Sequence, residues 1–168
     1  MKLSYTIRHW AGLDWSRFCA AAADAKLGGL ELDSVKNPAL GGKSSPANPE
    51  LAAAVRRRLA EQGLSIPCVG VEAELTDPEA GPELTAALET ARNLLVPYVV
   101  LRTTCDDVQT VTAALEPAVA QAERTDVALL LETIGGMADT KKLVEVLDYF
   151  ACDHLAACWN AHSTCLMQ

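Results

Sequence analysis

The stretch VALLLETIGG, residues 127–136, joins five aliphatic residues to an abrupt polar end. A short aliphatic run bounded by glycines is typical of a strand inside a parallel sheet. The run ends at Glu132, and Gly135 and Gly136 then let the chain turn away. A carboxylate at this place loses part of its hydration and needs a partner, either an arginine or a metal ion. The stretch therefore predicts a buried strand that opens onto a polar site.

Similar aliphatic runs recur along the whole chain. They begin at residues 3, 29, 66, 98, 127 and 155, so successive starts are 26, 37, 32, 29 and 28 residues apart. Each interval fits one strand, one helix and two loops, which is the pattern of repeated βαβ units. We expect parallel strands, buried on both faces, at residues 3–7, 29–32, 66–71, 98–101, 127–131 and 155–159.

Apolar stripes at helical spacing fill the five gaps between these runs. Residues that favour the first turn of a helix precede or open each stripe: Asp14, Asn48 with Pro49, Pro82, Asp106 or Asp107, and Asp139 or Thr140. Pro117 lies inside the fourth stripe, where we expect a kink or a restart. Residues 36–49 are rich in Gly, Ser and Pro and predict a long loop. With no linker along the chain, residues 1–168 are expected to form a single α/β domain.

Composition narrows the function classes. The chain has 168 residues, with 14 Lys and Arg against 22 Asp and Glu, for a net charge of −8. This charge repels phosphate backbones, so we expect no nucleic-acid partner. The longest apolar run is too short for a membrane span, so no membrane partner is expected. Six cysteines without a CxxC pair, and no recognisable signal peptide, predict free thiols in a cytoplasmic protein.

Polar side chains follow every predicted strand. They are Arg8 and His9, Glu31 and Asp33, Glu72 and Glu74, Arg102 to Thr104, Glu132 and Thr133, and Asn160 and His162. Ligands of parallel α/β folds bind at the carboxyl ends of the strands. In an open sheet only the strands beside the switch point need such ends, whereas in a closed barrel all of them face one mouth. The distribution therefore favours a barrel.

Glu132, Asn160 and His162 offer a carboxylate, an amide oxygen and an imidazole at neighbouring strand ends, a set able to share a divalent cation. Other interpretations stay open. Glu132 also fits a solvated loop carboxylate or an ion pair with Arg102. His162 fits a hydrogen-bonded loop histidine, and Glu31 fits a structural carboxylate that accepts from backbone N–H groups.

Four segments together resemble the sugar phosphate isomerase/epimerase group, the xylose isomerase-like TIM barrels that also include AP endonuclease family 2. They are GLELDS (29–34), VPYVVLRTT (96–104), VALLLETIGGMADT (127–140) and LAACWNAHSTC (155–165). The resemblance extends from residue 3 to residue 165. Its most specific pieces are the strand that ends in Glu-Thr before a glycine loop, and WNAH (159–162), similar to the family's Trp-Asp-x-His motif.

The resemblance implies a metal-dependent isomerase or epimerase of carbohydrate metabolism. A divalent metal, Mn²⁺, Mg²⁺, Co²⁺ or Zn²⁺, would polarise a sugar or sugar phosphate while a glutamate moves a proton between adjacent carbons through an enediolate. By position, Glu132 corresponds to a metal ligand that also acts as base, and Asn160 to a metal-binding aspartate. His162 is then a catalytic residue. The implied substrate contacts are His9, Glu31, Arg102 and Ser163.

Two departures from the family pattern change what is expected. Asn160 in place of aspartate removes a negative charge from the implied metal site. The sequence also supplies about six strands and five helices of the eight units in a TIM barrel. We therefore expect an incomplete, C-terminally truncated barrel, as a fragment, a shortened reading frame or a partial barrel completed by another copy. Its last strand would have a free edge, which predicts self-association, and the chain alone is inactive if the missing strands are essential.

Three alternatives to the enzyme stay in view. The first is a non-catalytic remnant or binding module of the same fold. The second is a nuclease like AP endonuclease family 2, which the acidic composition disfavours. The third is a doubly wound nucleotide binder, which requires a glycine-rich first turn, whereas RHWAGLDW (8–15) contains one glycine.

Overall fold

The structure is a computed structural model that describes residues 2–8, 14–40 and 45–166. The described residues form six strands: β1 (Ser4–Thr6), β2 (Gly29–Glu31), β3 (Val69–Gly70), β4 (Tyr98–Leu101), β5 (Ala128–Glu132) and β6 (Leu155–Cys158). Every one lies within or overlaps a predicted strand. The third is the shortest, covering two of the residues predicted at 66–71.

All strand pairs are parallel, and each strand pairs with its neighbour in sequence. One sheet contains β1 and β2, and a second contains β3, β4, β5 and β6 in that order. Isolated bridges between Gly29 and Ser65 and between Leu32 and Val69 join the two sheets. The strands thus follow one another in chain order, as in the wall of a (β/α) barrel. The expectation of an incomplete TIM-barrel type is confirmed.

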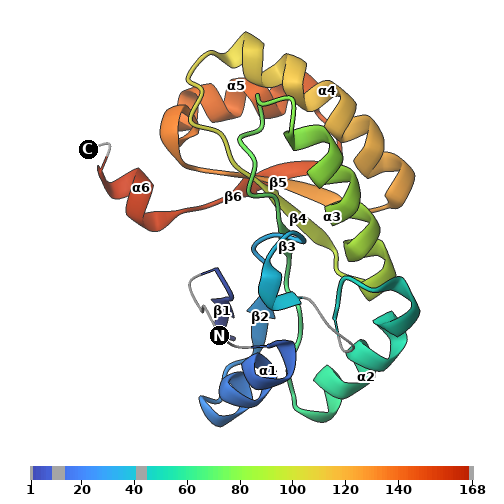
Figure 1. The fold of residues 1–168 in the computed structure, drawn as a ribbon. Helices are drawn as coiled ribbons and strands as arrows, with labels where there is room; N and C mark the ends of the chain where they lie inside the picture. The colour runs from blue at the N-terminus through green and yellow to red at the C-terminus, as the bar shows by residue number, and fades with distance from the viewer. Residues whose placement is uncertain (1, 9–13, 41–44, 167–168) are drawn as a thin grey trace.

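Five longer helices alternate with the strands: α1 (Trp15–Asp24), α2 (Ala52–Glu61), α3 (Ala80–Leu94), α4 (Val108–Thr125) and α5 (Thr140–Phe150). Short 3-10 helices lie at η1 (Pro38–Leu40), η2 (Pro49–Leu51) and η3 (Gly135–Ala138), and a sixth α-helix, α6 (Ala161–Leu166), follows β6. Figure 1 shows α3, α4 and α5 side by side along one side of the strands, with α6 away from them. Among the described residues, no helix is both long and apolar enough to cross a membrane.

Capping explains where the helices begin. The side chains of Asp14, Asp107 and Asp139 accept hydrogen bonds from backbone N–H groups at the starts of α1, α4 and α5. Asn48 caps the short η2, and α2 follows directly. We expected a kink or a restart at Pro117; the restart is wrong, since α4 is one helix across this residue, and the kink stays a prediction. The proline removes one backbone donor, and the apolar stripe on either side of it continues into the core.

The expected burial of every strand on both faces is wrong for several strands. In β5, Leu129 and Leu131 are fully buried, whereas Leu130 and Glu132 on the other face are half-buried. In β6 only Leu155 is buried, and Ala156 and Ala157 are exposed. The helices cover one face of these strands. Within the described residues, no opposite barrel wall covers the other.

Strand β6 pairs with β5 on one side, and no strand among the described residues pairs with its other side. Trp159 follows it with 72% of its surface exposed. A free strand edge beside an exposed aromatic residue is a place where another chain can add a strand.

We predict that the 168-residue chain self-associates through this edge. The amide of Leu129 donates to His154 and that of Thr133 to Cys158, so alternation along β6 turns the amide of Ala157 to the free side. Ala157→Pro removes that donor. Sedimentation velocity at micromolar concentration should give a concentration-dependent distribution for the wild type and a more monomeric one for the variant. A sharp wild-type monomer would contradict the prediction.

Candidate functional site

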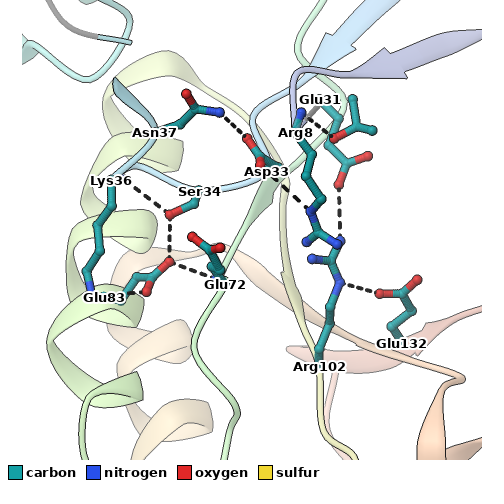
Figure 2. Close-up of polar contacts among 11 residues, drawn as sticks. Arg8, Glu31, Asp33, Ser34, Lys36, Asn37, Glu72, Glu83, Arg102 and Glu132 are labelled. Atoms are coloured by element: carbon teal, nitrogen blue, oxygen red, sulfur yellow. Dashed lines mark hydrogen bonds and ion pairs between the residues drawn. The ribbon is translucent and has the colours of Figure 1, made fainter. Parts of the chain in front are cut away.

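Polar side chains from five strands meet at the carboxyl ends, as the sequence pattern predicts. Arg8 follows β1, Glu31 ends β2, Arg102 follows β4, Glu132 ends β5 and Asn160 follows β6. Figure 2 shows Arg102 reaching between Glu31 and Glu132, with the guanidinium of Arg8 nearby. The strand ends thus bring together residues that are up to 152 positions apart in the sequence.

Arg102 is the central contact of this group. Its Nε donates to Glu132 Oε2 at 2.5 Å, and its Nη2 lies 3.8 Å from Glu31 Oε1. The side chains of Arg102, Glu132 and Glu31 are 18%, 15% and 25% exposed, so the charges are largely removed from water. The Nη1 atom of Arg102 is buried and has no hydrogen-bond partner among the described residues. A buried guanidinium donor without a partner is a place where a ligand oxygen can bind.

Asn160 is the second partner of Glu132. Its Nδ2 donates to Glu132 Oε1 at 2.8 Å, and its Oδ1 accepts from the backbone N–H of Ser163 at 3.0 Å, in the first turn of α6. Its backbone N–H donates to the Thr133 hydroxyl at 2.6 Å. Both carboxylate oxygens of Glu132 therefore have protein partners. Of the interpretations left open by the sequence, the ion pair with Arg102 is present.

Glu31 lies in a less favourable environment for a charge. Burial raises the pKa of its carboxyl group, Arg8 opposes this, and the nearby charges of Glu132 and Asp33 raise the pKa further. No backbone N–H of the described residues donates to it, so the interpretation as a carboxylate satisfied by the backbone receives no support here. A carboxyl group with a raised pKa beside a second carboxyl group is an arrangement that can supply an acid and a base.

Two thiols lie near these carboxylates. Burial raises the pKa of Cys68 to about 12, and the charges of Glu31, Cys158 and Glu132 act in the same direction. Burial, followed by Glu132 and Glu31, also raises the pKa of Cys158. Both side chains are therefore neutral thiols at physiological pH, and they line the site without adding charge.

The sequence predicted three further site residues: His162, Ser163 and His9. His162 lies on α6, where it is exposed, and within the described residues no polar contact joins it to Glu132 or Asn160. Ser163 is half-buried and contributes its backbone N–H to the Asn160 cap. His9 lies outside the described residues. The roles predicted for these three stay predictions.

A second polar cluster, which sequence reasoning missed, holds the loop after β2 against α3. The carboxylate of Glu83, only 2% exposed, accepts from the Ser34 hydroxyl at 2.8 Å and from the backbone N–H of Glu72 at 2.7 Å, and it lies 3.2 Å from Lys36 Nζ. Figure 2 shows this cluster on the other side of Asp33 from Arg102. Glu83 stands beside Leu84 in a helix, where a carboxylate is normally solvated, so no local signal distinguishes it.

The two glycines of the opening stretch have a packing role. Gly135 has φ +51°, and a Cβ there would lie 2.6 Å from Thr104 Cα. A Cβ on Gly136 would lie 2.6 Å from the carbonyl oxygen of Cys105. The loop after β5 therefore touches the backbone of the loop after β4, which is possible only without side chains. This contact fixes the loop that follows Glu132.

The implied divalent metal does not fit the arrangement around Glu132. The described residues contain no group of three His, Cys, Asp or Glu side chains placed to hold a metal ion. One oxygen of Glu132 is hydrogen-bonded to the Arg102 guanidinium, and Asn160 presents its NH₂ group rather than its oxygen to the other. Coordination by Glu132 and Asn160 stays a prediction from the resemblance alone.

Comparison with solved structures identifies the fold, whereas no protein-family model and no curated protein matches the sequence. A xylose isomerase domain protein from Planctomyces limnophilus matches with a TM-score of 0.71 at 14% identity over 97% of this chain. An L-ribulose 3-epimerase matches with 0.74 at 14% identity over 100%. The IolI protein with a bound zinc atom matches with 0.69 at 14% identity over 92%. The chain thus has the xylose isomerase-like barrel fold and spans 61 to 63% of these structures.

We predict that Gly136→Ala destabilises the protein by more than about 2 kcal/mol, because the new methyl group meets backbone atoms that cannot rotate away. Gly81→Ala is the matched control, since a Cβ at that position meets nothing within 4 Å and the residue lies in the first turn of α3. Urea denaturation should give a neutral or slightly stabilising effect for the control. Equal midpoints for the two variants would refute the packing role.

We predict that Glu83→Gln lowers stability at neutral pH by about 1–3 kcal/mol. Burial alone would raise the pKa of Glu83, but the bonds from Glu72 and Ser34 and the charge of Lys36 outweigh it and lower the pKa. The stabilisation that the ionised Glu83 provides is therefore complete at pH values above its ordinary pKa of 4.5. It is lost as the pH falls through the lower pKa that Glu83 has in the folded protein.

Urea denaturation of the wild type and Glu83→Gln at several pH values tests this, with the exposed Glu89→Gln in the same helix as control. The gap between wild type and Glu83→Gln should narrow in acid, while the control stays close to the wild type. A gap that does not change with pH would mean that the charge of Glu83 is irrelevant.

Proposed function

We propose, on the premise of the xylose isomerase-like barrel fold, that this chain acts on a sugar or a related polyhydroxy carbonyl compound by moving a proton between carbon atoms. One observation carries the proposal. The carboxylate of Glu132 and the carboxyl group of Glu31 lie on either side of the Arg102 guanidinium at the carboxyl ends of the strands. An L-ribulose 3-epimerase with the same fold supports the substrate class.

Glu132 is the proposed base. It forms an ion pair with Arg102, and each carboxylate oxygen retains a lone pair beyond its present hydrogen bond. The proton leaves a carbon next to the substrate carbonyl and moves to Glu132. The electron pair of the broken C–H bond forms a C=C bond, and the carbonyl oxygen becomes the negatively charged oxygen of an enediolate.

Arg102 is the proposed partner of that oxygen. Its buried Nη1 has no protein acceptor in the described part of the chain, so it is free to donate where the charge develops. A donor already fixed in a largely dry site stabilises developing charge without rearrangement. This step uses only groups of the protein.

The return of the proton decides the product. Glu132 can return it to the former carbonyl carbon while the hydroxyl of the adjacent carbon gives its proton to the negatively charged oxygen and becomes the new carbonyl, which exchanges an aldose and a ketose. Glu31, whose raised pKa favours the protonated form, can donate to the opposite face of the same carbon, which inverts it. In the second case Glu31 becomes ionised and Glu132 protonated, and solvent resets both groups.

Metal dependence, implied by the resemblance, is not part of these steps, because the donor set around Glu132 does not favour a metal ion. His162 as a catalytic residue, and His9 and Ser163 as substrate contacts, stay part of the proposal, which for these residues rests on the sequence and the resemblance. Mn²⁺, Mg²⁺, Co²⁺ or Zn²⁺ as cofactor rests on the resemblance and, for zinc, on the IolI protein.

A second candidate is a non-catalytic sugar-binding module of the same fold. The observation in its favour is that both oxygens of Glu132 are already hydrogen-bonded, to Arg102 and Asn160. In that case the cluster is a fixed structural pair, and the sugar is bound without bond breaking.

Proton exchange separates the two candidates. The chain is incubated in D₂O with L-ribulose or D-fructose, and NMR follows deuterium entering at the carbons next to the carbonyl. We expect incorporation with the wild type, a loss of at least about 100-fold in Glu132→Gln, and no loss in Glu89→Gln. Saturation-transfer NMR that detects binding without exchange would favour the binding module. Exchange that survives in Glu132→Gln would refute the role of Glu132.

A further inference from the structure

We propose that the guanidinium of Arg102 holds the place of a metal cation at this site, so that the chain neutralises Glu132 without a divalent ion. The proposal concerns cation binding and does not depend on the proposed function. It rests on three features: the partners of Glu132, the orientation of Asn160 and the charges that surround them.

The partners of Glu132 already do what a metal ion would do for a buried carboxylate. Arg102 donates to one oxygen at 2.5 Å and Asn160 to the other at 2.8 Å, while only 15% of the Glu132 side chain is exposed. A carboxylate with a guanidinium and an amide donor is paired and hydrogen-bonded, which removes the need for a further cation.

The orientation of Asn160 is fixed from both sides. Its oxygen accepts from the backbone N–H of Ser163, and its NH₂ group donates to Glu132. Turning the amide over would set its oxygen against the carboxylate oxygen and its NH₂ group against an N–H donor, so both contacts would be lost. Asn160 therefore presents a donor to Glu132, whereas a metal ligand must present a lone pair.

The local charges oppose a divalent ion. Arg102 is shared by Glu132 and Glu31, so one positive charge already lies between the two carboxylates. A divalent ion on either oxygen of Glu132 would lie beside the guanidinium, and like charges repel more strongly in a largely buried site than in water. An aspartate at position 160 would add a negative charge that favours binding of a metal ion, whereas the amide of Asn160 is uncharged.

Mn²⁺ binding to the full chain tests the proposal. Free Mn²⁺ is measured by electron paramagnetic resonance during titration of the wild type, Glu132→Gln, Asn160→Asp and the double variant Arg102→Met with Asn160→Asp. We expect the wild type and Glu132→Gln to bind equally weakly. The double variant should bind at least about tenfold more tightly than the wild type, because it loses the cation and gains a carboxylate.

Circular dichroism and thermal melting establish that each variant is folded. Stoichiometric Mn²⁺ on the wild type that is lost in Glu132→Gln would overturn the proposal, as would a folded double variant with no gain. If the double variant does not fold, Arg102→Lys, which keeps the charge, replaces it. Arg102→Lys should bind Mn²⁺ as weakly as the wild type, and tight binding would overturn the proposal. Absence of deuterium exchange leaves all these outcomes unchanged, so the two proposals fail separately.

Discussion

A carboxylate that is largely withdrawn from water keeps its charge only beside a compensating group. In this chain the group is Arg102, which holds Glu132 directly and Glu31 at longer range. Arg102 follows β4, Glu132 ends the adjacent β5, and Glu31 ends β2. One guanidinium therefore ties the ends of two paired strands to the end of a strand in the other sheet. The geometry of the candidate site follows from this pairing, while the backbone N–H of Ser163 and the carboxylate of Glu132 set the direction in which Asn160 presents its amide.

Much of the fold could be predicted from local patterns. Regular spacing of aliphatic runs located all six strands, and capping residues such as Asp107 and Asp139 marked the helix starts. Burial on both faces could not be predicted, because it depends on whether another part of the barrel faces the strand. Helix α6 was missed because Asn160, which caps its first turn, was interpreted as a ligand. The sequence is compatible with Asn160 as a metal ligand and with Asn160 as a helix cap. Only its contacts in the structure decide between the two.

The proximity of the candidate site residues could be predicted from the sequence more readily than their individual partners. Strand-end position alone brought Glu31, Arg102, Glu132 and Asn160 together, since parallel strands deliver their carboxyl ends to one edge. Whether Glu132 meets a cation from solution or from the chain depends on the reach of one arginine side chain, which no spacing rule encodes. The Glu83 cluster was beyond prediction for a similar reason, because its partners lie in two separate segments, one after β2 and one after β3.

The contact between Asn160 and Glu132 links the site to the start of α6. The same side chain caps the helix, and the neighbouring Trp159 donates from its indole Nε1 to Thr164 in that helix at 2.8 Å. Any molecule that takes the place of the amide at Glu132 also releases this cap and alters the surroundings of an indole that is 72% exposed, whereas Trp15 is buried in the core. Intrinsic fluorescence at the red edge of the emission spectrum thus supplies a label-free optical signal of occupancy.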